Sequence, residues 1–139
     1  MKRVLILFIC LCVAFVAIFV SAGCLNNQKL YYSDINNYIL ASGIVSYINY
    51  NEDESTLYIA FEDLSYGFSD NCFKITGANV KIIKDNDVDS YLSVGKTAFF
   101  SSAPEYFGDG YIIPIVSLSI DGIEFLSFSE GYKNLLRDY

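Results

Sequence analysis

Hydrophobic residues follow two patterns along this chain: a continuous apolar run near the start, and shorter alternating runs after it. Residues 4–20 contain no charged or polar side chain apart from Cys10 and Cys12. Five later runs are rich in β-branched and aromatic residues; they cover 38–50, 55–63, 72–84, 96–102 and 111–120. Residues 55–63 alternate most clearly, with Leu57, Ile59 and Phe61 on one face. The pattern therefore predicts five β-strands.

Turn signals fall inside and between these runs. Gly43 and Gly77 interrupt the first and the third run, which indicates a bulge or a sharp bend at each of them. Two Asp-Gly pairs, Asp109-Gly110 and Asp121-Gly122, are the strongest hairpin signals in the chain. Antiparallel neighbours joined by turns are therefore expected near the end of the domain.

The helix that the sequence predicts inside the domain covers residues 87–95, with Asp87 as its N-cap and Gly95 as its end. Three strands, a short helix and two more strands is the order of the OB-fold, a five-stranded, partly open Greek-key barrel. The segments "ASGIVSYI", "TLYIAF" and "LSVGKTAFFSSAPEYFGDGYIIPI" also resemble the nucleic-acid-binding type of OB domain. In that family a Leu-x-x-Gly after the helix opens the fourth strand, and a turn with an aromatic residue and Gly leads to the fifth.

This resemblance spans residues 38–120 and implies a mainly β fold, a small five-stranded OB-like Greek-key barrel with one short helix. Its motifs specify a barrel and little of the ligand. We expect residues 1–23 to be a signal peptide or membrane anchor, 24–37 a polar tether and 38–128 the OB-like domain. We expect residues 129–139 to be a C-terminal tail, either irregular or folded into a short helix.

The apolar run at the start has the three parts of an export signal. Lys2 and Arg3 form a basic start, residues 4–20 the hydrophobic region, and small residues follow. Extended through Leu25, the run is also long enough to cross a bilayer. The positive-inside rule keeps the two basic residues on the cytoplasmic side. An N-terminal hydrophobic signal or anchor helix is therefore predicted, with the domain on the extracytoplasmic side of the cell membrane.

Three fates remain open for the end of this run. Ala22-Gly23-Cys24 resembles the last three positions of a lipobox, which implies cleavage before Cys24 and a lipid on that residue, although Ser21 departs from the usual apolar first position. Ordinary cleavage after Ala22 and an uncleaved anchor are the alternatives. A lipid on Cys24 would leave Cys72 as a lone thiol, whereas the other fates permit a Cys24–Cys72 disulfide in an oxidising exterior.

Charge excludes some partners. The chain after residue 24 carries 7 basic and 16 acidic residues, a net charge of −9. Nucleic acids and anionic membrane surfaces are bound mainly by clustered Lys and Arg, so neither is an expected partner of the domain. A glycan, a peptide or another protein is expected instead.

Sequence signatures of catalysis and metal binding are absent. The chain has no His, no Gly-x-Ser-x-Gly and no phosphate loop, so a non-enzymatic protein without a cofactor is expected. Residues 85–90, "DNDVDS", resemble the opening of a calcium loop, but Ser90 and Lys96 occupy the places that need Gly and Glu. No metal site is therefore predicted.

The OB resemblance implies a binding surface on strands two and three and on the loops 50–55 and 103–110. Residues expected on that face or in its loops, including the loop between strands two and three, are Tyr58, Tyr66, Phe68, Lys74, Tyr106 and Phe107. Exposed aromatic side chains stack on sugars, bases or partner side chains. Alternatively, a small barrel with 12 Tyr and 11 Phe uses several of them to fill its ends.

Two functions follow from this sequence. The first is a membrane-tethered binding module on the outer side of the cell, for a peptide, a glycan or a protein. The second is a structural or accessory subunit of an envelope complex, in which the domain is a rigid spacer. An aromatic patch over strands two and three would favour the first, and a flat apolar patch elsewhere would favour the second.

Overall fold

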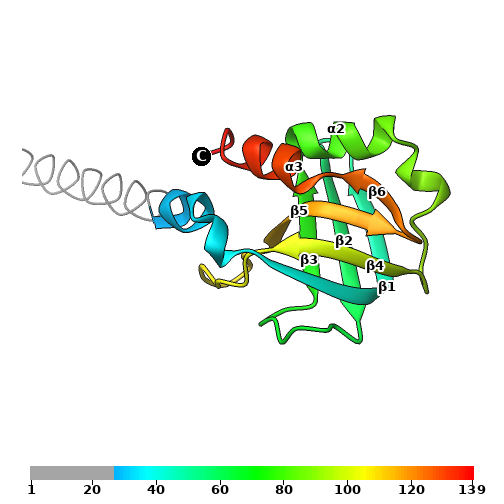
Figure 1. Cartoon of the computed structure of the whole chain (residues 1–139), viewed down its shortest axis with the longest axis horizontal. Coiled ribbons are helices and arrows are strands. Elements are labelled where there is room, and N and C mark those ends of the chain that lie inside the picture. Colours follow the sequence, from blue (N-terminus) through cyan, green and yellow to red (C-terminus); the bar gives the residue numbers. More distant parts are fainter. Residues whose placement is uncertain (1–26) are drawn as a thin grey trace, which may run out of the picture.

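Six strands and several short helices make up the part of the chain that the computed structural model describes, residues 27–139 (Figure 1). The strands are β1 (Ile39–Asn51), β2 (Thr56–Glu62), β3 (Cys72–Thr76), β4 (Thr97–Ser102), β5 (Ile113–Ile120) and β6 (Ile123–Leu126). Residues 27–33 are helical, and the other helices are η1 (Ile35–Asn37), α2 (Gly77–Asp85), η2 (Val88–Ser90) and α3 (Phe128–Leu135). The prediction of a mainly β fold is confirmed.

Hydrogen bonding joins the strands in the order β3-β2-β1-β4-β5-β6, with every neighbouring pair antiparallel. A short parallel pairing links β3 to β5, where Phe73 lies opposite Ile113 and Lys74 opposite Pro114. The first five strands therefore bond in a ring. This arrangement is loosely compatible with the OB-like fold that the sequence predicts.

β1 has no bulge at Gly43, which pairs with Ala98 of β4 in an unbroken register. Its register with β2 shifts between Val45 and Tyr47, two residues later than predicted. Gly43 has a different role: a Cβ at this position would lie 2.9 Å from the Cβ of Phe61. The absence of a side chain therefore permits the close approach of β1 and the core residue on β2.

The interior of the ring is filled by the inward faces of the strands. Phe61, Phe73 and Phe100 are at most 1% exposed, and the rings of Phe61 and Phe100 stack with centroids 4.6 Å apart. Val80 and Ile83 of α2 join the same hydrophobic cluster. The alternation that predicted β2 holds, because Leu57, Ile59 and Phe61 are all buried while the residues between them are not.

The prediction that residues 72–84 form one extended run is wrong. β3 ends at Thr76, and α2 begins at Gly77, whose φ of +54° is a left-handed conformation that glycine adopts without strain. Val80 and Ile83, three residues apart, then face the core from one side of a helix. The sequence therefore changes from β to helical periodicity at this glycine.

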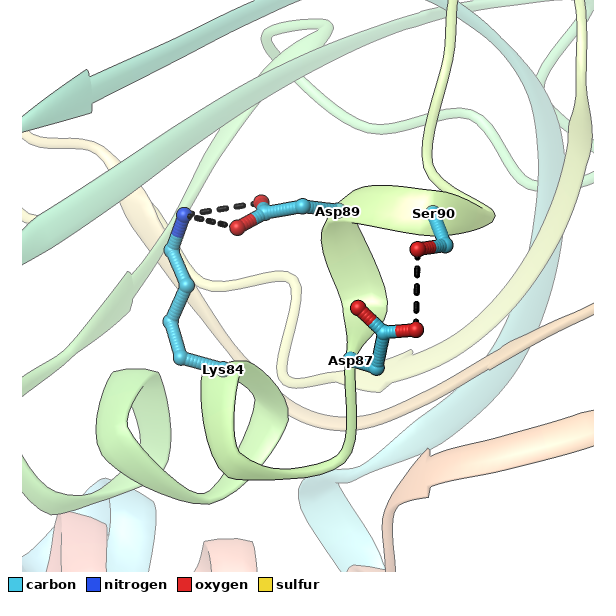
Figure 2. A network of polar contacts seen from close by, with 4 residues as sticks. All are labelled: Lys84, Asp87, Asp89 and Ser90. Carbon is cyan, nitrogen blue, oxygen red and sulfur yellow. Dashed lines mark hydrogen bonds and ion pairs between the residues drawn. The ribbon is translucent and has the colours of Figure 1, made fainter.

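The predicted helix over 87–95 is also wrong: the structure has only the 3₁₀ turn η2 there. Asp87 does not cap a helix, since its φ is +58° and its carboxylate accepts a hydrogen bond from Ser90 at 2.8 Å. Figure 2 shows Lys84, at the end of α2, reaching the carboxylate of Asp89, with an N–O distance of 2.7 Å. Two acidic residues of "DNDVDS" thus bond to nearby side chains, Asp87 to Ser90 and Asp89 to Lys84.

The two Asp-Gly pairs behave differently. Asp121-Gly122 forms the tight turn between β5 and β6, with φ of +53° and +81°, as a type I′ hairpin requires. This turn leads to β6, a sixth strand that the sequence interpretation did not include. Asp109-Gly110 lies instead within the longer connection between β4 and β5, residues 103–112.

Residues 27–37, within the stretch assigned to a polar tether, pack on the domain. Tyr32 is fully buried, and its ring stacks on Tyr139 with centroids 5.5 Å apart. Tyr132 of α3 donates a hydrogen bond to the carbonyl of Ser33 at 2.7 Å. Figure 1 shows the helical residues 27–33, in blue, close to the end of α3, in red. A second hydrophobic cluster thus lies outside the ring, between this segment, α3 and β5.

The predicted signal or anchor at residues 1–23 and the predicted lipid site at Cys24 lie outside the described residues. Within residues 27–139, no helix combines the length and the apolar character that crossing a bilayer requires.

Candidate functional site

Tyr58 and Lys74, the two residues predicted for the binding face, lie directly opposite each other on β2 and β3. Both side chains point away from the core, because the residues on either side of each of them are buried. The Tyr58 hydroxyl donates to the Glu54 carboxylate at 2.9 Å, and the Lys74 ammonium lies 5.2 Å from the centre of the Tyr111 ring. The structure therefore holds both side chains in place on the outer surface.

The protonation of this pair reflects those contacts. The hydrogen bond to Glu54 raises the pKa of Tyr58, because ionising the hydroxyl would remove the donor and place two negative charges together. Burial lowers the pKa of Lys74, and the nearby Glu54 carboxylate partly offsets this effect. The tyrosine is therefore held as a neutral phenol that donates to Glu54, and the lysine nitrogen lies over an aromatic ring.

Tyr47 and Asn49 of β1 extend this face, which the sequence interpretation missed. Asn49 pairs with Tyr58, and Tyr47 pairs with Ala60, the next outward residue of β2. Tyr47 is 53% exposed. Its place depends on the register shift after Val45, so no simple alternation in residues 38–50 would have assigned it to this surface. We call Tyr47, Asn49, Tyr58 and Lys74 the tyrosine–lysine face.

The other four predicted residues divide into two groups. Tyr66 and Tyr106 are exposed in the loops before β3 and β5, and the Tyr106 hydroxyl donates to Asp109 at 3.0 Å. Phe68 instead packs edge-on against Phe73 at 4.8 Å between ring centroids, and Phe107 packs against the ring of Tyr111 at 5.2 Å. Phe68 thus packs against the core of the ring, and Phe107 belongs to the second hydrophobic cluster outside it.

Three tyrosine hydroxyls form a chain next to Lys74 of the tyrosine–lysine face. Tyr32 and Tyr111 are 2.6 Å apart at their hydroxyl oxygens, and Tyr111 and Tyr139 are 3.1 Å apart. Burial is the main cause that raises the pKa of all three. Because Tyr111 also supports Lys74, this tyrosine chain connects the second hydrophobic cluster to the outer face of β3.

The tyrosine chain predicts an alkaline limit to stability. Each raised pKa favours the neutral phenol in the folded state, so stability is fully present below about pH 10, the pKa of an unfolded tyrosine, and falls above it. Replacing both Tyr32 and Tyr111 with Phe removes two of these groups together. Denaturant unfolding between pH 9 and 11.5 should then show a smaller loss for the double variant, by up to about 1.4 kcal/mol per pH unit for each group removed. Equal alkaline slopes in both proteins would contradict this assignment.

Cys72 lies on the outer side of β3, beside Ala60 of β2. Its side chain is half-buried, and burial followed by the charge of Asp70 raises the pKa of the thiol. The thiol form therefore predominates at neutral pH, which makes this residue a poor nucleophile.

A small cleft with both polar and apolar lining lies on the outer face of the other strands. It has a volume of about 150 Å³, and its lining residues come from β1, β4, β5, β6 and α3. Leu40 and Phe99, both in its lining, are 72% and 48% exposed. The sequence interpretation did not single out either residue. We call this feature the Leu40–Phe99 cleft.

Residues 27–139 contain no group of three or more His, Cys, Asp or Glu side chains placed to hold a metal ion. Comparison with protein-family models, with curated proteins and with solved structures found no match to this chain. The class that the structure defines is a small, mainly β domain with ring-like strand bonding and two distinct outer surfaces.

Proposed function

We propose that this chain is an OB-type, non-enzymatic binding module held on the outer side of the cell membrane, which binds a peptide, glycan or protein through the tyrosine–lysine face. The OB assignment is supported by the ring of five strands, by α2 between β3 and β4, and by the pairing of β3 with β5. The segment resemblance over residues 38–120 agrees with that arrangement.

One observation carries the binding function: Tyr58 and Lys74 are adjacent, outward-facing and fixed by their own neighbours. A ligand therefore meets an aromatic surface and a cation that lose little side-chain freedom on binding. An aromatic ring beside hydrogen-bonding groups suits a sugar ring or a planar side chain. The face contains one lysine and Asn49, and the Glu54 carboxylate lies beside it on the Tyr58 hydroxyl, so a ligand meets donors and acceptors together.

The location rests on the sequence of residues 1–25, with its basic start, its apolar run and Cys24. The intact mass of the protein purified from membranes separates the three fates of this segment. A mass that begins at Cys24 and includes a lipid supports lipid anchoring. The mass of the uncleaved chain would replace it with a membrane-spanning anchor, and a cleaved chain without lipid would remove the anchor from the proposal.

A structural or accessory subunit is the second candidate, and the Leu40–Phe99 cleft is the observation that favours it. Nucleic-acid binding ranks third, because the net charge of −9 after residue 24 opposes a phosphate backbone. Tight, salt-sensitive binding of single-stranded nucleic acid by the purified protein would overturn this order.

Binding by the tyrosine–lysine face is tested with immobilised glycan and peptide panels probed with the full-length protein. We expect Tyr58→Ala and Lys74→Met each to weaken binding to a retained ligand about tenfold, as buried aromatic and charged contacts at a binding centre do. Phe99→Ser, which alters the other outer surface, is the matched control and should keep the affinity of the unaltered protein. If every retained ligand binds Tyr58→Ala and Lys74→Met as tightly as it binds the unaltered protein, the assignment of this face is wrong.

A further inference from the structure

The outer face of β1, β4, β5 and β6 has an unusual composition for a solvent-facing sheet surface. Leu40, Ile44 and Phe99 point outward, and small hydroxyl residues lie next to them in the hydrogen-bonded register. Phe99 has Ser42 on one side and Ser119 on the other. A large ring between two serines leaves open space beside it, and this space is the Leu40–Phe99 cleft.

The size of the cleft limits what it can hold. A volume of about 150 Å³ fits one large side chain, and ordinary small-molecule sites are roughly two to six times larger. Leu40 and Phe99 together expose roughly 200 Å² of apolar surface, well below the ~800 Å² per partner that a stable dimer needs. The cleft therefore suits one anchoring side chain of a partner segment and is too small to support a dimer of this protein.

The charged residues of this face indicate which residues of the partner flank its anchoring side chain. Glu62 is the neighbour of Ile44 across β1 and β2, and Glu124 is the neighbour of Ser119 across β5 and β6, so the two carboxylates flank the apolar centre on opposite sides. Among residues 27–139, neither glutamate takes part in an ion pair, whereas nearby Lys96 is paired with Asp121. The face therefore presents negative charge in the lining of the cleft, from Glu124, and on the far side of Phe99 beyond Ile44, from Glu62.

We propose that the Leu40–Phe99 cleft binds one segment of a partner protein, in which a bulky apolar side chain is flanked on both sides by lysine or arginine. The apolar side chain fills the space beside Phe99. The two cations face Glu62 and Glu124. This surface is separate from the tyrosine–lysine face, so the inference goes beyond the proposed function and can fail without it.

Strand spacing sets the spacing of the partner's charges. Both glutamates lie two strands from Phe99, about 10 Å away at ~4.8 Å per strand, and Glu62 is displaced by two further residues along the strands, because its neighbour Ile44 pairs with Thr97. An extended chain covers that distance in about three residues. The matching probe is the peptide acetyl-Lys-Ser-Ser-Trp-Ser-Ser-Lys-amide. Because the chain has no Trp, the emission of the peptide reports binding without background from the protein.

The experiment titrates this probe with the full-length protein in a zwitterionic detergent, with detergent alone as the blank. We expect a blue shift of the Trp emission on binding, and about tenfold weaker binding of the probe in which Glu replaces both Lys residues. Phe99→Ser should weaken binding about tenfold, while Tyr47→Ser, a similarly exposed aromatic residue on the other face, should leave it unchanged.

A double variant tests whether Glu62 and Glu124 recognise the cations of the partner segment. In Glu62→Gln combined with Glu124→Gln, the Lys and Glu probes should bind equally, because the neutral amides keep the shape of the surface. Equal binding of the two probes by the unaltered protein would overturn the proposal, as would full binding by Phe99→Ser. Self-association of the protein that Phe99→Ser abolishes would also overturn it, by making a second copy the occupant.

Discussion

Replacing Phe100 with alanine is expected to lower the free energy of unfolding by about 4 kcal/mol. Phe100 is fully buried, stacks on Phe61 at 4.6 Å and contacts Phe73 at 5.0 Å between ring centroids. Its removal leaves a cavity at the centre of the ring, where strands bonded on both sides cannot collapse into the space. Urea unfolding followed by far-UV circular dichroism measures the loss.

The neighbouring residue provides the matched control. Phe99 is the same residue type, in the same strand, with its side chain on the opposite face and 48% exposed. Phe99→Ala should therefore cost less than about 1 kcal/mol. If Phe100→Ala does not fold, Phe100→Leu keeps most of the volume and should lose about 1.5 kcal/mol. Similar losses for Phe99→Ala and Phe100→Ala would show that the ring interior is not the main core.

Strands were predictable where one face is buried and the other is not. β2 follows strict alternation, with buried Leu57, Ile59 and Phe61, and its predicted and observed bounds differ by one residue at each end. The tight turn at Asp121-Gly122 was predictable as well, because both residues adopt the left-handed conformation that this dipeptide tolerates. In each case the information is contained within a few neighbouring residues.

The sequence predictions were wrong where contacts with distant residues, and not the local sequence, determine the structure of a segment. Residues 77–85 are rich in β-branched residues, yet Val80 and Ile83 reach the core only as a helix. The polar-looking residues 27–37 pack on the domain because Tyr32 is buried by partners that lie 79 and more residues later, Tyr111 and Tyr139. β6 is short and half exposed, so four residues carried too little pattern to identify it.

The two outer surfaces show the same limit. Tyr58 and Lys74 could be placed on one face from the OB resemblance, and the observed register sets them opposite each other. Leu40 and Phe99 are far apart in the sequence, and each follows ordinary strand alternation. Only the register between β1 and β4 brings them together with Ser42 and Ser101 between them. A surface that depends on how two strands pair cannot be predicted from the sequence of either strand alone.

Replacing Gly131 with alanine tests the packing of α3 on the ring, because two effects of opposite sign compete. Inside a helix, alanine is favoured over glycine by about 1 kcal/mol. The added Cβ would overlap the backbone carbonyl oxygen of Val116 on β5 and lie 2.7 Å from its carbon. Backbone atoms cannot turn aside as a flexible side chain does, so α3 must move away from β5.

That displacement also strains a buried polar contact. Asn79 of α2 donates to the carbonyl of Gly131 at 3.0 Å and accepts from Asn134 at 2.9 Å, so moving α3 weakens both bonds. We expect the overlap to outweigh helix propensity, with a net loss of about 2–3 kcal/mol in the free energy of unfolding. The control is Ser129→Ala, at an exposed position in the first turn of the same helix, which should change the stability by less than about 0.5 kcal/mol. A gain of stability in Gly131→Ala would mean that α3 does not pack against Val116.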